Sequence, residues 1–98
     1  MPIFAIEYSY TDDTAARDIH RPAHREYMTE LADAGINLGS GVFGPDDSPG
    51  ALFLFVAPDR TGAVDLTEKD PFRREGLVAS IEVKQWTPFF GPLVGLGG

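Results

Sequence analysis

The sequence contains no cysteine. This absence excludes thiol catalysis, thiolate metal ligands and disulfide bonds. The sequence also lacks any apolar run near the ~20 residues that a transmembrane helix needs. Met1 leads directly into an alternating segment, without the positively charged start of a signal peptide. We therefore expect a cytoplasmic protein that does not enter a membrane.

Basic residues are scarce: 8 Lys and Arg stand against 15 Asp and Glu, for a net charge of −7. They are also scattered, whereas nucleic acids and anionic membranes bind to clustered cations. Neither kind of partner is expected. Pro22 lies between His20 and His24 and argues against one continuous helical face carrying both histidines, so no metal site is predicted. No cofactor is predicted either.

What the chain does have is apolar and aromatic content, 43% and 11% of its 98 residues. That content and length predict a single globular domain over residues 1–98. A lone domain of this size buries only about two-thirds of its unfolded surface. Because small chains often gain stability by association, we expect a homodimer.

Apolar periodicity and turn residues predict an α+β fold, the ferredoxin-like βαββαβ sandwich. The expected elements are strand 2–10, helix 22–34, strand 36–44, strand 51–57, helix 59–69, helical turn 71–76 and strand 77–86. Residues 15–20 read as either a short helical turn or an ordered loop. One sheet face takes the helices, and the other is exposed unless a second subunit covers it. The tail 88–98, rich in Pro, Gly and aromatic residues, is expected to pack on a partner or to fray.

Side-chain orientation follows from the same patterns. Strand 2–10 should place Tyr8 on one face with its apolar neighbours, and strand 51–57, apolar on both faces, should be central and buried. In strand 77–86, the inward residues should be Leu77, Ala79, Ile81 and Val83. Glycines in strand 36–44 mark a bulge or a place where a ligand comes close.

The helix predicted over 22–34 begins at Arg21-Pro22-Ala23-His24, because proline is favoured in a first turn. Gly35 supplies its stop. His24 shares one helical stripe with Tyr27, Met28 and Leu31, at spacings i, i+3, i+4 and i+7. The imidazole therefore faces inward.

Several local motifs occur in order over roughly residues 3–90. They are Arg21-Pro22-Ala23-His24, Ala34-Gly35, Gly44-Pro45, Pro49-Gly50, Asp70-Pro71-Phe72 and Gly76-Leu77. In these motifs the chain resembles the YciI-like (YCII-related) family. The resemblance implies a dimeric ferredoxin-like α+β barrel, with two sheets packed face to face. It also implies an active site built on His24 and Asp70, and some family members are linked to breakdown of halogenated aromatic compounds as dehydrohalogenases.

A histidine is the side chain best suited to move protons at neutral pH. An aspartate bonded to one ring nitrogen fixes the tautomer and leaves the other nitrogen free as a base. The competing interpretations are structural: an inward histidine is often a satisfied core group, and Asp-Pro is a common turn opener. If His24 and Asp70 lie beyond ~4 Å of each other, outside a cavity, the acid–base hypothesis loses its basis.

Three further residues are candidates for substrate binding. Arg21 either binds an anionic substrate or forms an ion pair with Asp18 or Asp70. Ser40 is the nearby hydroxyl, and Tyr8 either lines an aromatic pocket or belongs to the core.

These residues lead to three functional hypotheses. The first is a small enzyme with a His–Asp acid–base dyad, acting on a small organic or aromatic substrate as a lyase, isomerase or dehydrohalogenase. The alternative is a non-catalytic dimer that binds a small ligand or serves as an accessory protein. The third is a cofactor-free monooxygenase on the same barrel.

Overall fold

Four strands of the chain form one antiparallel sheet in the order β2-β3-β1-β4. The structure is a computed structural model that describes residues 1–96. The elements in chain order are β1 (Ile3–Tyr10), α1 (Thr14–Asp33), β2 (Asn37–Val42), β3 (Gly50–Val56), α2 (Arg60–Glu68), α3 (Pro71–Arg74) and β4 (Val78–Trp86). This arrangement confirms the predicted α+β class and the ferredoxin-like order of elements.

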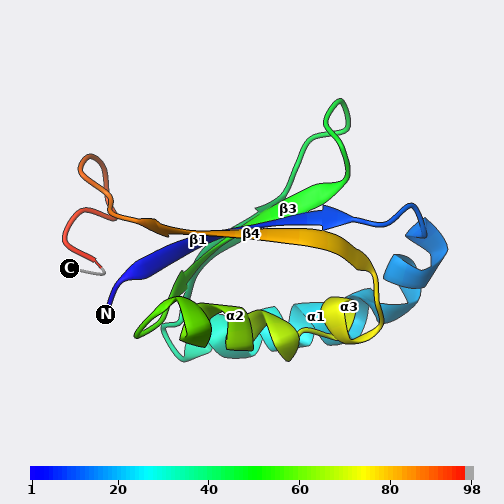
Figure 1. The fold of residues 1–98 in the computed structure, drawn as a ribbon, viewed down its shortest axis with the longest axis horizontal. Coiled ribbons are helices and arrows are strands. Elements are labelled where there is room, and N and C mark those ends of the chain that lie inside the picture. Colours follow the sequence, from blue (N-terminus) through cyan, green and yellow to red (C-terminus); the bar gives the residue numbers. More distant parts are fainter. Residues whose placement is uncertain (97–98) are drawn as a thin grey trace.

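The three helices lie on one side of the sheet, and its other side is open (Figure 1). The core fills the space between the two layers. Its buried members from the sheet are Phe4, Ile6, Tyr8, Ala51, Phe53 and Phe55, and those from the helices are Met28, Leu31 and Ala63. The inward face predicted for β1 is confirmed at Phe4, Ile6 and Tyr8. None of the helices within residues 1–96 is long and apolar enough to cross a bilayer.

Helix α1 differs most from the prediction, since it begins at Thr14 and not at Pro22. The Asp13 side chain caps it by accepting the Ala16 N–H at 3.0 Å. Pro22 therefore lies inside the helix, where it removes one backbone hydrogen bond, a defect of about 3 kcal/mol. The proline predicts a helix start, whereas the Asp13 cap and the packing of the helix on the sheet stabilise a longer helix that contains it. The predicted end is confirmed, with Gly35 at φ +76°.

Two strands also depart from the prediction. Strand β3 is central, but one of its faces belongs to the open side of the sheet, and Leu52 there is 40% exposed. In β4, Ser9 pairs with Ser80 and Tyr10 with Val78, so the register shifts by one residue. This bulge puts Val78 against the core and leaves Ala79 exposed, contrary to the predicted alternation. The irregularity expected at the glycines of β2 is confirmed at Gly39.

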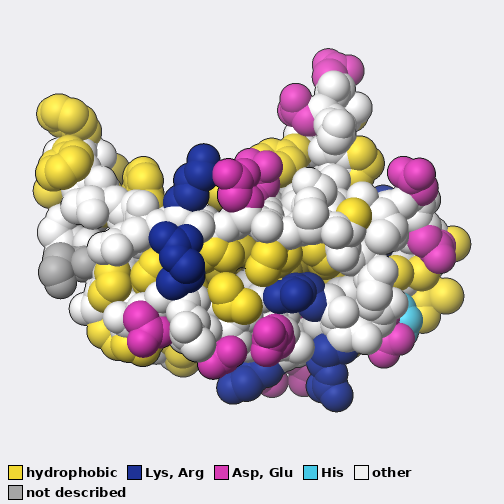
Figure 2. Space-filling view, viewed as in Figure 1, with side chains coloured by type: hydrophobic (Ala, Val, Ile, Leu, Met, Phe, Trp, Pro, Cys, Tyr) yellow, Lys and Arg dark blue, Asp and Glu magenta, His cyan; other side chains and the backbone are white. Residues whose placement is uncertain are grey.

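The predicted tail continues beyond β4 as turns over residues 91–96, and residues 97–98 lie outside the described part of the chain. Both this tail and the β2–β3 hairpin rise on the open side of the sheet (Figure 1). Phe89 is 76% exposed and Phe90 is 95% exposed. Apolar side chains accordingly gather at the projecting end of the molecule (Figure 2).

Candidate active site

His24 and Asp70 meet although 46 residues separate them in the sequence. His24 lies in the middle of α1, and Asp70 is the residue that caps the short helix α3. Pro71 disfavours a helical backbone at Asp70, which is extended and directs its carboxylate toward α1. Nδ1 of His24 lies 2.7 Å from Oδ1 of Asp70. The two motifs singled out in the sequence thus form one hydrogen-bonded pair.

The Asp70 carboxylate is fully buried and receives three hydrogen bonds. Oδ1 accepts the Phe72 N–H at 3.0 Å as well as the bond from His24, and Oδ2 accepts the Tyr8 hydroxyl at 2.8 Å. An ionised carboxylate can only accept, so Nδ1 of His24 carries a proton in this arrangement. In the neutral imidazole with this tautomer, Nε2 presents a lone pair. It forms no hydrogen bond with any of residues 1–96.

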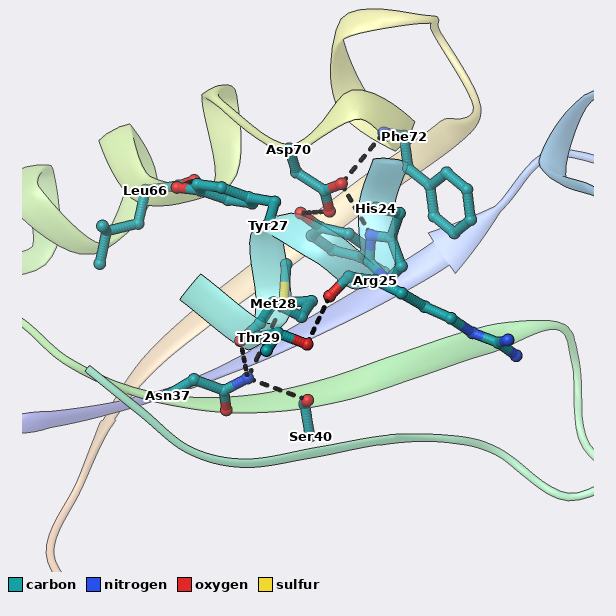
Figure 3. Close-up of polar contacts among 11 residues, drawn as sticks. His24, Arg25, Tyr27, Met28, Thr29, Asn37, Ser40, Leu66, Asp70 and Phe72 are labelled. Atoms are coloured by element: carbon teal, nitrogen blue, oxygen red, sulfur yellow. Dashed lines mark hydrogen bonds and ion pairs between the residues drawn. The ribbon is translucent and has the colours of Figure 1, made fainter. Parts of the chain in front are cut away.

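Aromatic rings hold the imidazole from two directions. The Phe72 ring stacks on His24 with 4.0 Å between centroids and 4° between planes. Phe53 approaches it edge-on, with centroids 6.2 Å apart. Figure 3 shows His24 between Phe72 and the Asp70 carboxylate. Stacking and hydrogen bonding together fix both the orientation and the tautomer of the ring, as a general base requires.

A cavity of about 500 Å³ adjoins this pair, and His24 forms part of its wall. Tyr10, Phe53 and Phe72 supply aromatic surface, and Ser40 and Asn37 supply polar groups. Only 12% of the His24 side chain is exposed. Because His24 lines the cavity, its imidazole is available to a molecule bound there, whereas Asp70 is buried and does not line the cavity.

The substrate-binding candidates have different positions. Arg21 and Ser40 both line the cavity, whereas Tyr8 is 1% exposed and lies behind His24 as a partner of Asp70. Arg21 forms an ion pair with Asp18, one of the two structural alternatives considered. Ser40 Oγ accepts a hydrogen bond from Asn37 Nδ2 at 3.2 Å.

Several of the residues that line the cavity were missed in the sequence, among them Phe72, Phe53, Tyr10 and Arg25. Phe72 belonged to the Asp70-Pro71-Phe72 motif and could have been named from it. The alternation of β3 places Phe53 on the inner face of the sheet, but alternation does not distinguish a residue of the cavity wall from one of the core. Tyr10 lies at the end of β1, on the same face as Tyr8. Arg25 falls outside the apolar stripe of its helix, so helical periodicity gives no signal for it.

His20 belongs to α1, so the prediction that Pro22 would interrupt the helix between the two histidines was wrong. Its Nε2 lies 3.8 Å from a Glu75 carboxylate oxygen. Within residues 1–96, no group of three His, Cys, Asp or Glu side chains is arranged to hold a metal ion.

Two tyrosines near Asp70 are held neutral. Burial raises the pKa of Tyr8 well above its usual 10.0, and the negative charge of Asp70 adds to this effect. Burial, again with the Asp70 charge, raises the pKa of Tyr10 to about 12. Tyr8 therefore remains a hydrogen-bond donor to Asp70 throughout the neutral and mildly alkaline range.

These shifts predict alkaline destabilisation. The unfolded chain releases tyrosine protons near pH 10 and the folded chain does not, so stability is present below that pH and lost above it. Between about pH 9 and pH 11, each buried tyrosine should lower the free energy of unfolding by about 1–2 kcal/mol. Urea unfolding at several pH values measures this slope. Tyr8→Phe should show a shallower slope than wild type, and equal slopes would contradict the assignment.

Comparison with known proteins agrees with this fold. A solved structure of the 5-chloro-2-hydroxyhydroquinone dehydrochlorinase TftG from Burkholderia phenoliruptrix AC1100, in complex with 2,5-dihydroxybenzoquinone, is similar with a TM-score of 0.75. The match is 24% identical and covers 87% of this chain and 93% of that one. The crystal structure of an antibiotic biosynthesis monooxygenase is similar with a TM-score of 0.57, at 18% identity, over 91% of this chain and 99% of that one.

No curated protein matches the chain. The model of the YCII-related domain matches residues 1–87, which contain every strand and helix and the whole His24–Asp70 site. The chain therefore belongs to the YCII-related domain family.

Proposed function

We propose that this protein is a small enzyme in which His24 acts as a general base on a small organic substrate bound in the cavity. The observation that carries the proposal is the 2.7 Å bond between His24 Nδ1 and a buried Asp70, at the wall of a 500 Å³ cavity. Asp70 is the residue that orients the imidazole and stabilises its protonated form. It does not itself contact the cavity.

An elimination of hydrogen halide is the reaction that best fits a single general base, His24, in a cavity with aromatic walls. Nε2 of His24 takes a proton from a C–H or O–H group of the substrate. The released electron pair forms a new double bond, and the halide departs with the electrons of its own bond. The imidazolium then returns its proton to solvent. In an isomerisation the same proton would be returned to a different substrate atom, so lyase and isomerase chemistry need the same base.

The comparison with TftG supports this choice of reaction, since that protein is a dehydrochlorinase with the same fold. The aromatic wall supplied by Tyr10, Phe53 and Phe72 supports a planar ring as the substrate. Monooxygenase chemistry has support from the fold alone, through the second structural neighbour.

The proposal is tested by screening halogenated hydroquinones for chloride release. Wild type should release chloride, and His24→Ala should not, because its side chain cannot accept a proton. His20→Ala is the matched control: it removes the other histidine of α1, which does not line the cavity. Unchanged turnover in His24→Ala would end the acid–base proposal. Saturable binding without turnover by wild type would instead support the non-catalytic ligand-binding alternative.

We also propose that the protein is a homodimer joined through the open face of its sheet. A hollow of about 280 Å³ lies there, lined by Phe43, Leu52, Leu54 and the backbone of two glycines. The projecting tail adds further exposed apolar groups, Phe89 and Phe90 among them. Exposed apolar patches on a soluble protein often mark surfaces that bind another protein.

Light scattering should therefore give a mass twice the 10.6 kDa of one chain. Leu52→Asp should shift the protein toward the monomer, because it places a charge in the proposed interface. Ile19→Asp is the control, since Ile19 is 73% exposed on α1, away from the open face. A 10.6 kDa wild-type species at working concentration would contradict the proposal.

A further inference from the structure

The cavity beside His24 has a charge opposite to that of the protein around it. The chain carries 15 acidic residues and a net charge of −7. No Asp or Glu side chain lines the cavity within residues 1–96, but two arginines, Arg21 and Arg25, do. Asp70, the nearest carboxylate to His24, is fully buried behind it and already accepts three hydrogen bonds.

The two arginines are not equivalent. Arg21 forms an ion pair with Asp18, which lies one helical turn earlier. The Arg25 guanidinium forms no hydrogen bond or ion pair with any of residues 1–96, and only its backbone carbonyl accepts a bond, from Thr29. In Figure 3 the Arg25 side chain reaches away from the Asp70 carboxylate, on the far side of the His24 ring. Its donors are therefore available to a ligand.

We propose that Arg25 binds an oxyanion on the substrate, so that the site selects planar ring compounds carrying a carboxylate or a phenolate. The inference rests on the proposed function only in using the same cavity. His24 and Arg25 both line the cavity, so a ring between the aromatic walls can meet both side chains. A guanidinium forms two parallel hydrogen bonds with a carboxylate and charge-assisted hydrogen bonds with the single oxygen of a phenolate.

A second polar part of the cavity wall, at Ser40 and Asn37, fits another substituent on the ring. Ser40 Oγ accepts the Asn37 amide, so the Ser40 hydroxyl hydrogen remains available to an acceptor on the ligand. Ser40 lies across from Phe53 in the sheet, on the wall that faces α1. The cavity wall thus offers donors from both Arg25 and Ser40 beside the proposed base, His24.

The test is binding of matched, unreactive probes, measured by NMR titration at low salt. Benzoate and benzamide have nearly the same shape and differ in charge, and wild type should bind benzoate more tightly. Arg25→Ala should weaken benzoate binding by about 10-fold, the loss expected for one charge-assisted pair, and benzamide binding by less than about 2-fold. The benzoate affinity of Arg25→Lys should lie between those of wild type and Arg25→Ala, because lysine keeps the charge but cannot form the two-pronged contact of a guanidinium.

Arg74→Ala is the matched control. The Arg74 side chain is likewise exposed on a helix and forms no hydrogen bond or ion pair with residues 1–96, but it does not line the cavity. It changes the net charge equally and should alter benzoate binding by less than about 2-fold, since exposed charges beyond the site are screened. If Arg25→Ala and Arg74→Ala lose the same benzoate affinity, the loss reflects only the change in net charge, and the proposal is overturned.

Titration with 4-nitrophenolate distinguishes the two sources of the oxyanion. The anion whose affinity depends more on Arg25 identifies the substrate group as carboxylate or phenolate. If Arg25→Ala binds both anions as tightly as wild type, or if wild type binds neither, the inference fails. None of these probes is turned over, so this failure is distinct from that of the proposed chemistry, which depends on chloride release in His24→Ala.

Discussion

Replacing His24 with glutamine is expected to reduce kcat by about 100-fold or more, the usual contribution of a positioned general base. The glutamine amide can still donate a hydrogen bond to Asp70 Oδ1, which His24 contacts at 2.7 Å. The fold and the cavity should therefore persist. The variant lacks a nitrogen that can take up a proton, so the loss should lie in kcat, with KM changed by less than about threefold.

Steady-state kinetics on the substrate found by the chloride-release screen measures this loss. His20→Gln makes the same chemical change one turn earlier in α1, at a histidine that faces Glu75 and not the cavity. It should retain wild-type kcat. A His24→Gln enzyme with kcat within about threefold of wild type would show that the imidazole is not the base.

Removing the Asp70 carboxylate is expected to cause the largest loss of stability. Asp70→Ala leaves the Tyr8 hydroxyl and the Phe72 N–H without their acceptor in a buried region, and each unsatisfied group costs about 1–3 kcal/mol. The bond from the Phe72 N–H is also the cap of α3. Together with the lost contact to His24, the free energy of unfolding should fall by about 3–5 kcal/mol. Urea unfolding at neutral pH measures the difference.

Asp59→Ala provides the matched comparison. Asp59 caps α2 through the Gly62 N–H at 2.7 Å, but it is exposed and bonds no buried side chain. Its loss should be about 1 kcal/mol, typical of a helix cap alone. If both alanine variants lose the same amount, Asp70 would be acting as a cap and not as the centre of a buried network.

The loss of unfolding free energy in Asp70→Asn should lie between the losses in Asp59→Ala and Asp70→Ala. The Phe72 N–H requires an oxygen at the Oδ1 position, so the asparagine amide oxygen should occupy it and still accept from His24. This variant should fold and keep the histidine tautomer while losing the negative charge. It therefore separates the structural contribution of the carboxylate from its electrostatic contribution to the base.

The order of elements could be predicted because it depends on local signals. Alternating apolar residues, glycine after a helix and proline after an extended residue each act through the backbone of a few neighbours. The same signals placed His24 on the inner face of its helix. The start of that helix could not be read, because one proline signals either a first turn or a tolerated defect, and packing over the whole length of α1 decided which.

The contacts between residues far apart in the sequence could not be predicted either. Sequence motifs indicated His24 and Asp70 as site residues. The hydrogen bond between Tyr8 and Asp70 could not be predicted, because the two residues are 62 positions apart and no local pattern connects them. Likewise, Arg21 and Arg25 differ only in whether Asp18 can reach them, and the sequence allowed either to bind a ligand.

The sequence by itself determined the class of fold, the inward histidine and the extended aspartate before Pro71, since each follows from backbone preference and periodicity. Only the tertiary structure decided that Asp70 is buried against Tyr8, that Phe72 stacks on His24, and that Arg25 faces the cavity unpaired. The physical reason is that hydrogen-bond partners and burial arise where α1, α3 and the sheet pack together. No single segment contains that information.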